Sequence, residues 1–337
     1  MVPKVSIVIP TLNSARTLRR CLDSISSQAF PRSHVEIIVV DAGSTDGTLG
    51  ILRDYPGIRV FPNPLRTGEA GKRVGLRHAR YPLLGLVDSD NILVGRDFLR
   101  KVLDPFRDPE VVGSEPRRFA WDPADHVLNR YCALMGVNDP LCYTLGVYDR
   151  ENVVTGFWTG LDVKWEERGT WHKAWFTPDT NPTVGANAFF IRTRDLKNAV
   201  KGDYLFDIDA VSLLISRGRN AYAMVDADVL HLYGRGVGDF VRKQTRRVKD
   251  YLHYRDRGER HYPWGRVPWY RWAAFVAATM LVFPHLITSV RGFLRRRDPA
   301  IFLHPVLSAV TLLLYGVQRL AGLVSTGIAS REGWQKG

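Results

Sequence analysis

Short apolar runs that alternate with amphipathic segments are the feature that most constrains the fold of this chain. Residues 5–9, 35–40, 58–61 and 83–87 are rich in small or branched apolar residues, and each of these runs is followed by polar sequence. Continuous apolar runs of this length are typical of strands buried on both faces of a parallel sheet. Between them lie segments with apolar residues at helical spacing, such as residues 14–25. The alternation predicts an α/β fold, Rossmann-like, with a mostly parallel central sheet and helices on both faces.

Polar loops follow three of the predicted strands, at residues 10–13, 41–48 and 88–91. Ligands of open α/β sheets bind outside the carboxyl ends of the strands, so these loops are expected to converge on one edge. The last loop contains Asp88 and Asp90, whose carboxylates can both reach one cation. Mg²⁺ and similar hard ions prefer oxygen ligands and commonly keep water or phosphate oxygens in their other positions. This spacing indicates a divalent ion with a nucleoside diphosphate, although a solvated turn can carry the same triplet.

Two common phosphate-binding motifs do not occur in the sequence. No GxGxxG follows the first predicted strand, and no GxxxxGK followed by Ser or Thr is present. The charge of a bound phosphate would therefore be met by a cation and by basic side chains.

Composition allows a large core and an anionic partner. The chain has 337 residues, of which 45% are hydrophobic, and 47 Lys and Arg against 34 Asp and Glu give a net charge of +13. That excess suggests a nucleotide, a nucleic acid or an anionic lipid. No CxxC pair is formed by the three cysteines, Cys21, Cys132 and Cys142. A disulfide framework or zinc site is therefore not expected, and the chain is expected in a reducing compartment. The N-terminus has no apolar h-region, and no cleaved secretion signal is predicted.

The C-terminal part of the chain has a different character. A basic segment at residues 236–271 precedes two stretches without charged residues, 272–290 and 301–317. About 20 apolar residues span a bilayer, so both stretches are borderline spans, and Trp269 and Tyr270 resemble interfacial anchors. The alternative is a pair of core helices in a soluble domain.

The topology of this hydrophobic helical hairpin is ambiguous. Two spans would place the linker at residues 291–297, with four arginines, on the far side from the N-terminal domain. That placement opposes the positive-inside tendency. An in-plane or re-entrant hairpin whose arginines snorkel is the alternative, and two spans are the preferred prediction.

The loops on the predicted sheet edge resemble those of family 2 glycosyltransferases, which have the GT-A fold. The matching segments are residues 5–13, 39–48, 71–76 and the Asp88-Ser89-Asp90 triplet. Ala42 stands where that family often has an acidic residue. The resemblance covers roughly residues 4–250, and the motifs occur in the family's order and spacing.

The second half of the chain resembles the family more loosely. Residues 184–192 resemble its acceptor-side segment, and residues 229–231 resemble a strand that ends in histidine. Asp207 occupies the aspartate of the family's Glu-Asp pair, but Phe206 replaces the glutamate, so Asp209 is a rival for the same role. Residues 244–248 resemble the QxxRW motif with valine in place of tryptophan, and processivity is therefore not expected.

The resemblance implies a metal-dependent, inverting glycosyltransferase that uses a UDP- or GDP-sugar. Asp207 would be the general base, and Mg²⁺ or Mn²⁺ would be held by Asp90, Asp88 and His231. Lys72, with Arg73 as the alternative, would neutralise the diphosphate. Residues expected to bind the donor are Pro10, Thr11, Asn13, Asp41, Gly43, Ser44, Asp46, Lys72, Asp88 and Arg247.

Several of these residues have structural alternatives. Asp41, expected to accept hydrogen bonds from the base or ribose, could instead cap a helix. His231 could be a satisfied histidine at a strand end, and Arg247 could belong to a basic membrane-facing helix. The aromatic residues at 157–176 are either an acceptor or lid region or ordinary core packing.

We expect a glycosyltransferase domain at residues 1–235, a basic linker or helix at 236–268, two membrane-associated helices at 269–328 and a tail at 329–337. The expected acceptor is a polyprenyl phosphate or another lipid-linked or extracellular glycan precursor, with the catalytic domain on the cytoplasmic side and no nucleic acid partner. The alternatives are a nucleotidyltransferase or a non-catalytic membrane protein that binds lipid or nucleotide.

Overall fold

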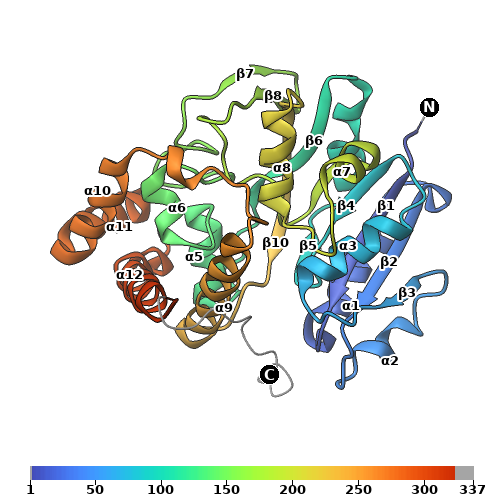
Figure 1. Cartoon of the computed structure of the whole chain (residues 1–337), viewed down its shortest axis with the longest axis horizontal. Coiled ribbons are helices and arrows are strands. Elements are labelled where there is room, and N and C mark those ends of the chain that lie inside the picture. Colours follow the sequence, from blue (N-terminus) through green and yellow to red (C-terminus); the bar gives the residue numbers. More distant parts are fainter. Residues whose placement is uncertain (1, 323–337) are drawn as a thin grey trace.

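A central sheet with helices on both faces forms the body of the molecule, and a group of helices from the C-terminal part packs at one end (Figure 1). The computed structural model describes residues 2–322. The sheet has ten strands in the order β3-β2-β1-β4-β9-β6-β10-β8-β7, and β5 pairs with β10. The strands are β1 (Val5–Thr11), β2 (Val35–Asp41), β3 (Arg59–Pro62), β4 (Leu83–Leu86), β5 (Asn91–Leu93), β6 (Val111–Phe119), β7 (Lys164–Glu167), β8 (Trp171–Trp175), β9 (Phe189–Arg192) and β10 (Ala221–His231).

The predicted parallel sheet is confirmed for the first four strands. β1 pairs in parallel with both β2 and β4, and β2 pairs in parallel with β3. Beyond β4 the sheet is mixed, because β9 enters antiparallel between β4 and β6. β6 and β10 are again parallel, whereas β5, β7 and β8 pair antiparallel with their neighbours. The carboxyl ends of β1, β2 and β4 meet at one edge, as the sequence predicts.

Helices cover both faces of the sheet. Alternate residues of β1 point to opposite sides: Ile7 and Ile9 belong to one apolar cluster and Val8 to another. Gly75 allows a helix to approach the strand closely, since a Cβ there would lie 2.2 Å from Val8. The α-helices of this part are α1 (Ala15–Ser26), α2 (Thr48–Leu52), α3 (Gly68–His78), α4 (Phe98–Leu103), α5 (Val127–Met135), α6 (Pro140–Leu145), α7 (Thr193–Ala199), α8 (Asp207–Ser216) and α9 (Val237–Asp256).

Four short 3-10 helices complete the described secondary structure. They are η1 (Arg32–His34), η2 (Asp104–Arg107), η3 (Trp264–Arg266) and η4 (Pro299–Phe302).

The C-terminal apolar sequence forms three helices where two were predicted. They are α10 (Trp269–Leu281), α11 (Phe283–Arg295) and α12 (Leu303–Gly322). The apolar stretch at residues 272–290 is divided because α10 and α11 meet at 90°. Pro284 lacks an N–H and its ring would clash with the preceding helical turn, and Val282 adopts a φ of 62° at the junction.

By length and composition alone, one helix within residues 2–322 could cross a membrane, Pro299–Leu320, and the bent α10–α11 pair would add a second if it formed one broken span. The last part of the predicted second helix, residues 323–328, and the predicted tail, residues 329–337, lie outside the described residues.

Candidate active site

Asp41 organises the two loops that follow β1 and β2. Its carboxylate accepts hydrogen bonds from the hydroxyls of Thr11 (2.9 Å) and Ser44 (2.6 Å) and from the backbone N–H groups of Gly43 and Ser44 (2.9 Å each). These four bonds fill the usual capacity of a carboxylate. The predicted contact with a base or ribose would therefore require one of the hydroxyls to turn away. Asp41 does not cap the helix that follows, because the N-cap of α2 is Gly47.

The neighbouring predicted donor residues complete the same scaffold. Asp46 accepts from the backbone N–H groups of Ala15 (3.0 Å) and Thr48 (2.9 Å), which ties the starts of α1 and α2 together. Burial alone would raise the pKa of Asp46, but the hydrogen bonds from Thr48 and Ala15 lower it. Asn13 has a left-handed φ of 52°, and its side chain accepts from the N–H of Thr45 at 2.9 Å.

Pro10 lies where β1 meets α3. A Cβ at Gly71 would stand 3.0 Å from the Cβ of Pro10, so the glycine permits this approach. Gly43 turns the loop after β2 with a φ of 83°. The predicted donor residues before α3 thus form two interlocked loops at one edge of the sheet.

Lys72 joins the predicted general base, Asp207, to Asp88 of the predicted cation site. Its buried ammonium lies 2.5 Å from Asp207 Oδ2 and 3.2 Å from Asp88 Oδ1. Burial alone would lower the pKa of Lys72, but Asp207 and Asp88 outweigh this and raise it, so the lysine is charged. Arg73, the alternative, donates to the carbonyl of Gly202 instead. The structure brings Lys72, and not Arg73, into the site.

Asp207 is the first residue of α8 and is mostly buried. Its Oδ1 finds no hydrogen-bond partner within residues 2–322. Burial raises the pKa of Asp207 to about 7; Lys72 opposes this rise and the charge of Asp88 adds to it. Gly185 has a φ of 134° and comes so close to Asp207 that a Cβ there would meet the backbone of the aspartate at 3.0 Å. The Asp207 carboxylate therefore keeps one buried oxygen without a hydrogen-bond partner, beside the segment predicted to face the acceptor.

Asp209 has a different environment, although it lies two residues away. Arg260 approaches its Oδ2 to 2.7 Å, and the N–H groups of His261 and Tyr262 donate to its Oδ1 at 2.5 and 2.9 Å. Asp209 thus anchors the segment after α9. Between the two rivals left by the sequence, the geometry favours Asp207 as the residue that can act on a ligand.

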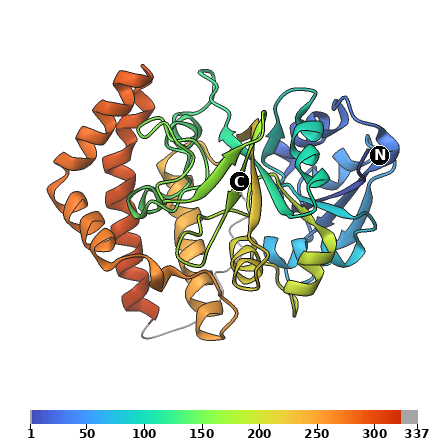
Figure 2. The ribbon, with the colours of Figure 1, turned by 90° about the horizontal axis from the view of Figure 1, so that it is seen from above.

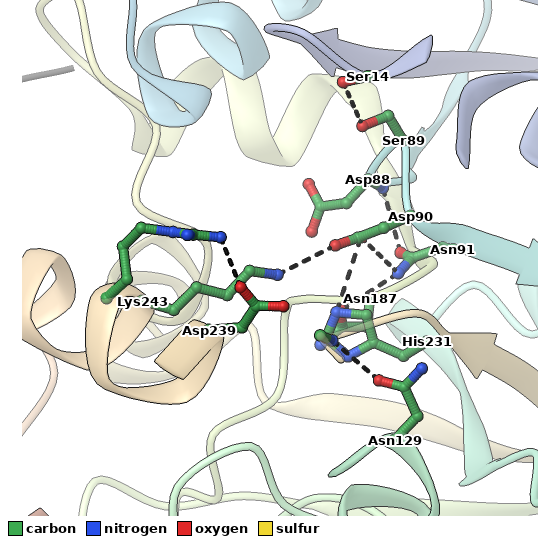
Figure 3. A network of polar contacts seen from close by, with 12 residues as sticks. Ser14, Asp88, Ser89, Asp90, Asn91, Asn129, Asn187, His231, Asp239 and Lys243 are labelled. Carbon is green, nitrogen blue, oxygen red and sulfur yellow. Dashed lines mark hydrogen bonds and ion pairs between the residues drawn. The ribbon is translucent and has the colours of Figure 1, made fainter. Parts of the chain in front are cut away.

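The DxD triplet and the end of β10 form the second part of the site (Figure 3). Asp90 Oδ1 lies 3.6 Å from Nε2 of His231, and Oδ2 lies 3.4 Å from the ammonium of Lys243. Burial alone would raise the pKa of Asp90, but His231 and Lys243 lower it. Asn91 is fully buried; its carboxamide accepts from the N–H of Asp88 and donates to the side chain of Asn187.

Lys243 lies in the basic segment at residues 236–271, and its position beside the DxD triplet was not predicted. The lysine extends from α9 to Asp90 (Figure 3). Its ammonium lies 4.5 Å from the centre of the Tyr233 ring. The sequence feature that could have pointed to Lys243 is its helical spacing, because it lies one turn before Arg247 on the same side of the helix. Arg247 itself is solvent-accessible and donates to Gln244 at 3.2 Å.

A buried arginine that sequence analysis missed holds the predicted acceptor-side segment. Arg150 is fully buried and pairs with Glu115 (2.5 Å) and Asp149 (2.7 Å). It also donates to the backbone carbonyls of Ala186 (2.9 Å) and Asn187 (3.2 Å). Asn187 has a left-handed φ of 56°, a conformation with a cost that these contacts help to offset. No local sequence pattern predicts that Arg150 is buried and holds the backbone of residues 186 and 187.

The chemistry of the donor set fits a divalent cation that is shared with a ligand. Within residues 2–322, no three or more His, Cys, Asp or Glu side chains lie close enough together to hold a metal ion. Of the three predicted ligands, Asp90 and His231 lie together, whereas Asp88 is paired with Lys72. An ion at Asp90 would therefore take diphosphate oxygens and water in most of its positions, as Mg²⁺ and Mn²⁺ commonly accept. The ammonium of Lys243 already places a positive charge beside Asp90, so a bound metal ion would share this carboxylate with the lysine.

The aromatic segment at residues 157–176 is mostly core. Trp158, Trp171 and Phe176 are buried. Trp165 on β7 remains 40% exposed and stacks on His172. Ordinary packing, the alternative left open by the sequence, accounts for most of this segment.

The chain matches the model of the family described as Glycosyl transferase family 2 over residues 6–194. It is similar to glycosyltransferase AglE of Haloferax volcanii, with 33% identity over 93 residues, or 26% of this chain and 31% of the relative. It is also similar to a poly(ribitol-phosphate) beta-glucosyltransferase of Bacillus spizizenii, with 35% identity over 103 residues, or 29% of this chain and 16% of the relative. A third relative, from Methanococcus voltae, is named as a glucuronosyltransferase acting on dolichyl N-acetyl-alpha-D-glucosaminyl phosphate. It is 24% identical over 109 residues, which are 31% of this chain and 34% of the relative.

These matches span about a third or less of each relative. Among solved structures, the chain is similar to mannosyltransferase PcManGT from Pyrobaculum calidifontis in complex with GDP-Man and Mn²⁺. The TM-score is 0.52 at 20% identity, and the match covers 93% of this chain and 88% of that one. The similarity confirms the GT-A fold that the resemblance implied.

Proposed function

Because the chain belongs to glycosyltransferase family 2, we propose that it transfers a sugar from a nucleotide-diphosphate sugar to a lipid-linked acceptor with inversion at the anomeric carbon. The observation that carries this proposal is the unpartnered Oδ1 of Asp207 beside Lys72 and the DxD triplet. A base, a diphosphate-neutralising lysine and a cation site thus lie within one cluster. Family membership favours this function over the nucleotidyltransferase and non-catalytic alternatives.

Asp207 would act as the general base. A carboxylate with a pKa of about 7 is largely ionised just above neutral pH and is basic enough to accept a proton from an attacking hydroxyl. The free Oδ1 would receive that proton while Oδ2 stays paired with Lys72. This arrangement favours an acceptor hydroxyl, as in a lipid-linked glycan, over a polyprenyl phosphate, whose oxygen is already anionic.

The departing nucleoside diphosphate would be held by cations. A divalent ion bound by Asp88, Asp90 and His231 would stabilise the negative charge on the leaving group. Lys72 and Lys243 approach this place from two sides, and their charges would act on the same phosphate oxygens. The loops organised by Asp41 would receive the nucleoside, and whether UDP or GDP binds there depends on their shape.

A membrane-linked acceptor is supported by two observations. The Methanococcus voltae relative is named for a dolichyl-phosphate-linked sugar, and the C-terminal helices of this chain expose apolar side chains. We place the catalytic domain on the cytoplasmic side, in agreement with the three free cysteines and the basic residues of α9.

Calorimetric titration with UDP, GDP and dTDP in the presence of Mn²⁺ tests this function. One of the three should bind, and Asp90→Ala should abolish the metal-dependent binding. Asp54→Ala is the matched control and should bind normally, because Asp54 is an exposed aspartate after the end of α2 that pairs with Arg19. A screen of the corresponding nucleotide sugars with extracted membrane lipids then identifies the sugar and the acceptor. Absence of binding by all three nucleotides would contradict the proposal.

A further inference from the structure

The three C-terminal helices expose a large apolar face. Figure 2 shows α10, α11 and α12 packed against one another at one end of the molecule. Their outward side chains include Met280, Leu281, Phe283, Leu294, Leu313 and Leu320, which are 59% to 75% exposed. Soluble monomers rarely expose a continuous apolar surface of this kind.

The polarity of these helices is inverted relative to helices that face water. Apart from Phe275 and Leu307, the buried residues of α10, α11 and α12 within residues 269–320 are small or polar: Thr279, His285, Ser289, Gly292, His304, Ser308 and Thr311. Thr279 contacts His285 at 3.1 Å, and Ser289 donates to the carbonyl of Ile301 at 3.1 Å. Helices in water bury their apolar side and expose their polar side. Helices in lipid meet through small and polar residues and turn their apolar side chains outward.

The bent pair returns to the side from which it leaves. α10 and α11 have 13 residues each, or about 20 Å at 1.5 Å per residue, which is shorter than the roughly 30 Å of a bilayer core. At the end of α11, Arg295 donates to the carbonyl of Val153, and the guanidinium of Arg296 lies 3.9 Å from the centre of the Trp121 ring. Because Val153 and Trp121 belong to the catalytic part, the arginine-rich linker lies on the catalytic side.

Polar contacts at two points of α12 argue against a span. Near its start, Nδ1 of His304 lies 2.9 Å from the hydroxyl of Tyr131 in α5. Three turns later, the hydroxyl of Tyr315 donates to Asp139 at the N-cap of α6. The helix also packs on α9. At these polar contacts one flank of α12 faces protein and not hydrocarbon.

We propose that α10, α11 and α12 form a monotopic anchor that inserts into one leaflet of a bilayer, and that none of the three crosses it. Trp269, 79% exposed at the start of α10, would lie at the interface. The exposed Arg291 and Arg297 would meet anionic headgroups, which is the charge complementarity expected from the basic chain. The anchor does not depend on the chemistry of the active site. It removes the conflict with the positive-inside tendency, since the linker stays on the catalytic side.

Vesicle flotation of the full chain tests insertion. We expect the protein to float with vesicles that contain phosphatidylglycerol and less with pure phosphatidylcholine. The double variant Leu281→Glu/Phe283→Glu should reduce the bound fraction at least about tenfold. Leu49→Glu, on α2 and 45% exposed, is the matched control and should float like the parent. Nucleotide binding by both variants, measured by calorimetry, shows that the catalytic part remains folded and separates failure of the anchor from failure of the proposed function.

Single-cysteine labelling in sealed membranes tests the topology. In a chain without its three native cysteines, Arg297→Cys should react with an impermeant maleimide from the same side as Lys201→Cys, an exposed position of the catalytic part. Labelling of the two positions from opposite sides would overturn the proposal. So would failure of the parent protein to float. If the double variant only lowers the oligomeric mass and still floats, the face is an interface between copies, which also overturns it.

Discussion

The two halves of the active site use the same residue types in opposite ways. In the donor loops, residues 10–13 and 41–48, the carboxylates of Asp41 and Asp46 are occupied by N–H and hydroxyl donors of their own loops. In the reaction cluster, around Lys72 and the DxD triplet, Asp207 keeps an oxygen without a partner within residues 2–322. A carboxylate whose oxygens are all hydrogen-bonded stabilises the loop around it, whereas a buried carboxylate with an unpartnered oxygen can accept a proton or bind a ligand. Scaffold variants should therefore lose stability, and cluster variants should lose binding or chemistry.

The largest loss of stability is expected at Arg150, which supports the scaffold of the acceptor-side segment. Arg150→Met leaves Glu115 and Asp149 buried without their partner, and the free energy of unfolding should fall by about 3–5 kcal/mol. Urea denaturation followed by circular dichroism measures the change. Arg118→Met is the matched control, because this half-exposed arginine pairs with the more exposed Asp226 and Asp228 and should cost at most about 1 kcal/mol. Equal losses of stability in the two variants would show that Arg150 does not stabilise the acceptor-side segment.

A smaller loss of stability is expected from Asp41→Asn. The amide keeps the size of the side chain but directs an NH₂ group at donors that the carboxylate now accepts, so unfolding should be easier by about 1–3 kcal/mol. The same denaturation experiment measures it, and nucleotide affinity should fall as the loops loosen. Weaker nucleotide binding with unchanged stability would instead mean that Asp41 contacts the nucleotide directly.

The smallest effect is expected at Lys243, in the reaction cluster. Lys243→Met removes a positive charge beside Asp90, so the protein without nucleotide should bind Mn²⁺ more tightly, by about 1 kcal/mol or roughly fivefold. Stability should change little, because the lysine is partly exposed. Titration calorimetry with Mn²⁺ alone measures the affinity. Weaker Mn²⁺ binding by the variant would show that Lys243 orders the site and does not compete with the cation.

Local patterns in the sequence predict the part of the site that lies on parallel strands. The apolar runs place Asp41 and Asp88 at one edge, and the basic helix before the triplet brings in Lys72. The pattern cannot show that Thr11 and Ser44 already satisfy Asp41, since that depends on the paths of two loops. Nor can it choose between Asp207 and Asp209, which differ because Arg260, 51 residues further along, reaches only the second.

The remaining differences arise from contacts between distant segments. β9 inserts antiparallel between β4 and β6, and its short run carries no signal of direction. The hydropathy of residues 272–290 predicts one continuous helix. In the structure this stretch is divided into two helices at Val282, which has a positive φ, and Pro284. Helical spacing places Lys243 and Arg247 on one side of α9 but does not say which of them meets Asp90.

The pH dependence of kcat/KM for the parent and for Asp207→Asn tests the central claim most directly. A base must be ionised to act, so the rate of the parent should fall as the pH drops through about 7, the pKa of Asp207, and should level off above it. The variant should lose about 10²–10⁴-fold in rate and should also lose this acidic limb, with nucleotide binding intact. A variant that retains the rate and the limb of the parent would contradict the assignment of Asp207 as the base.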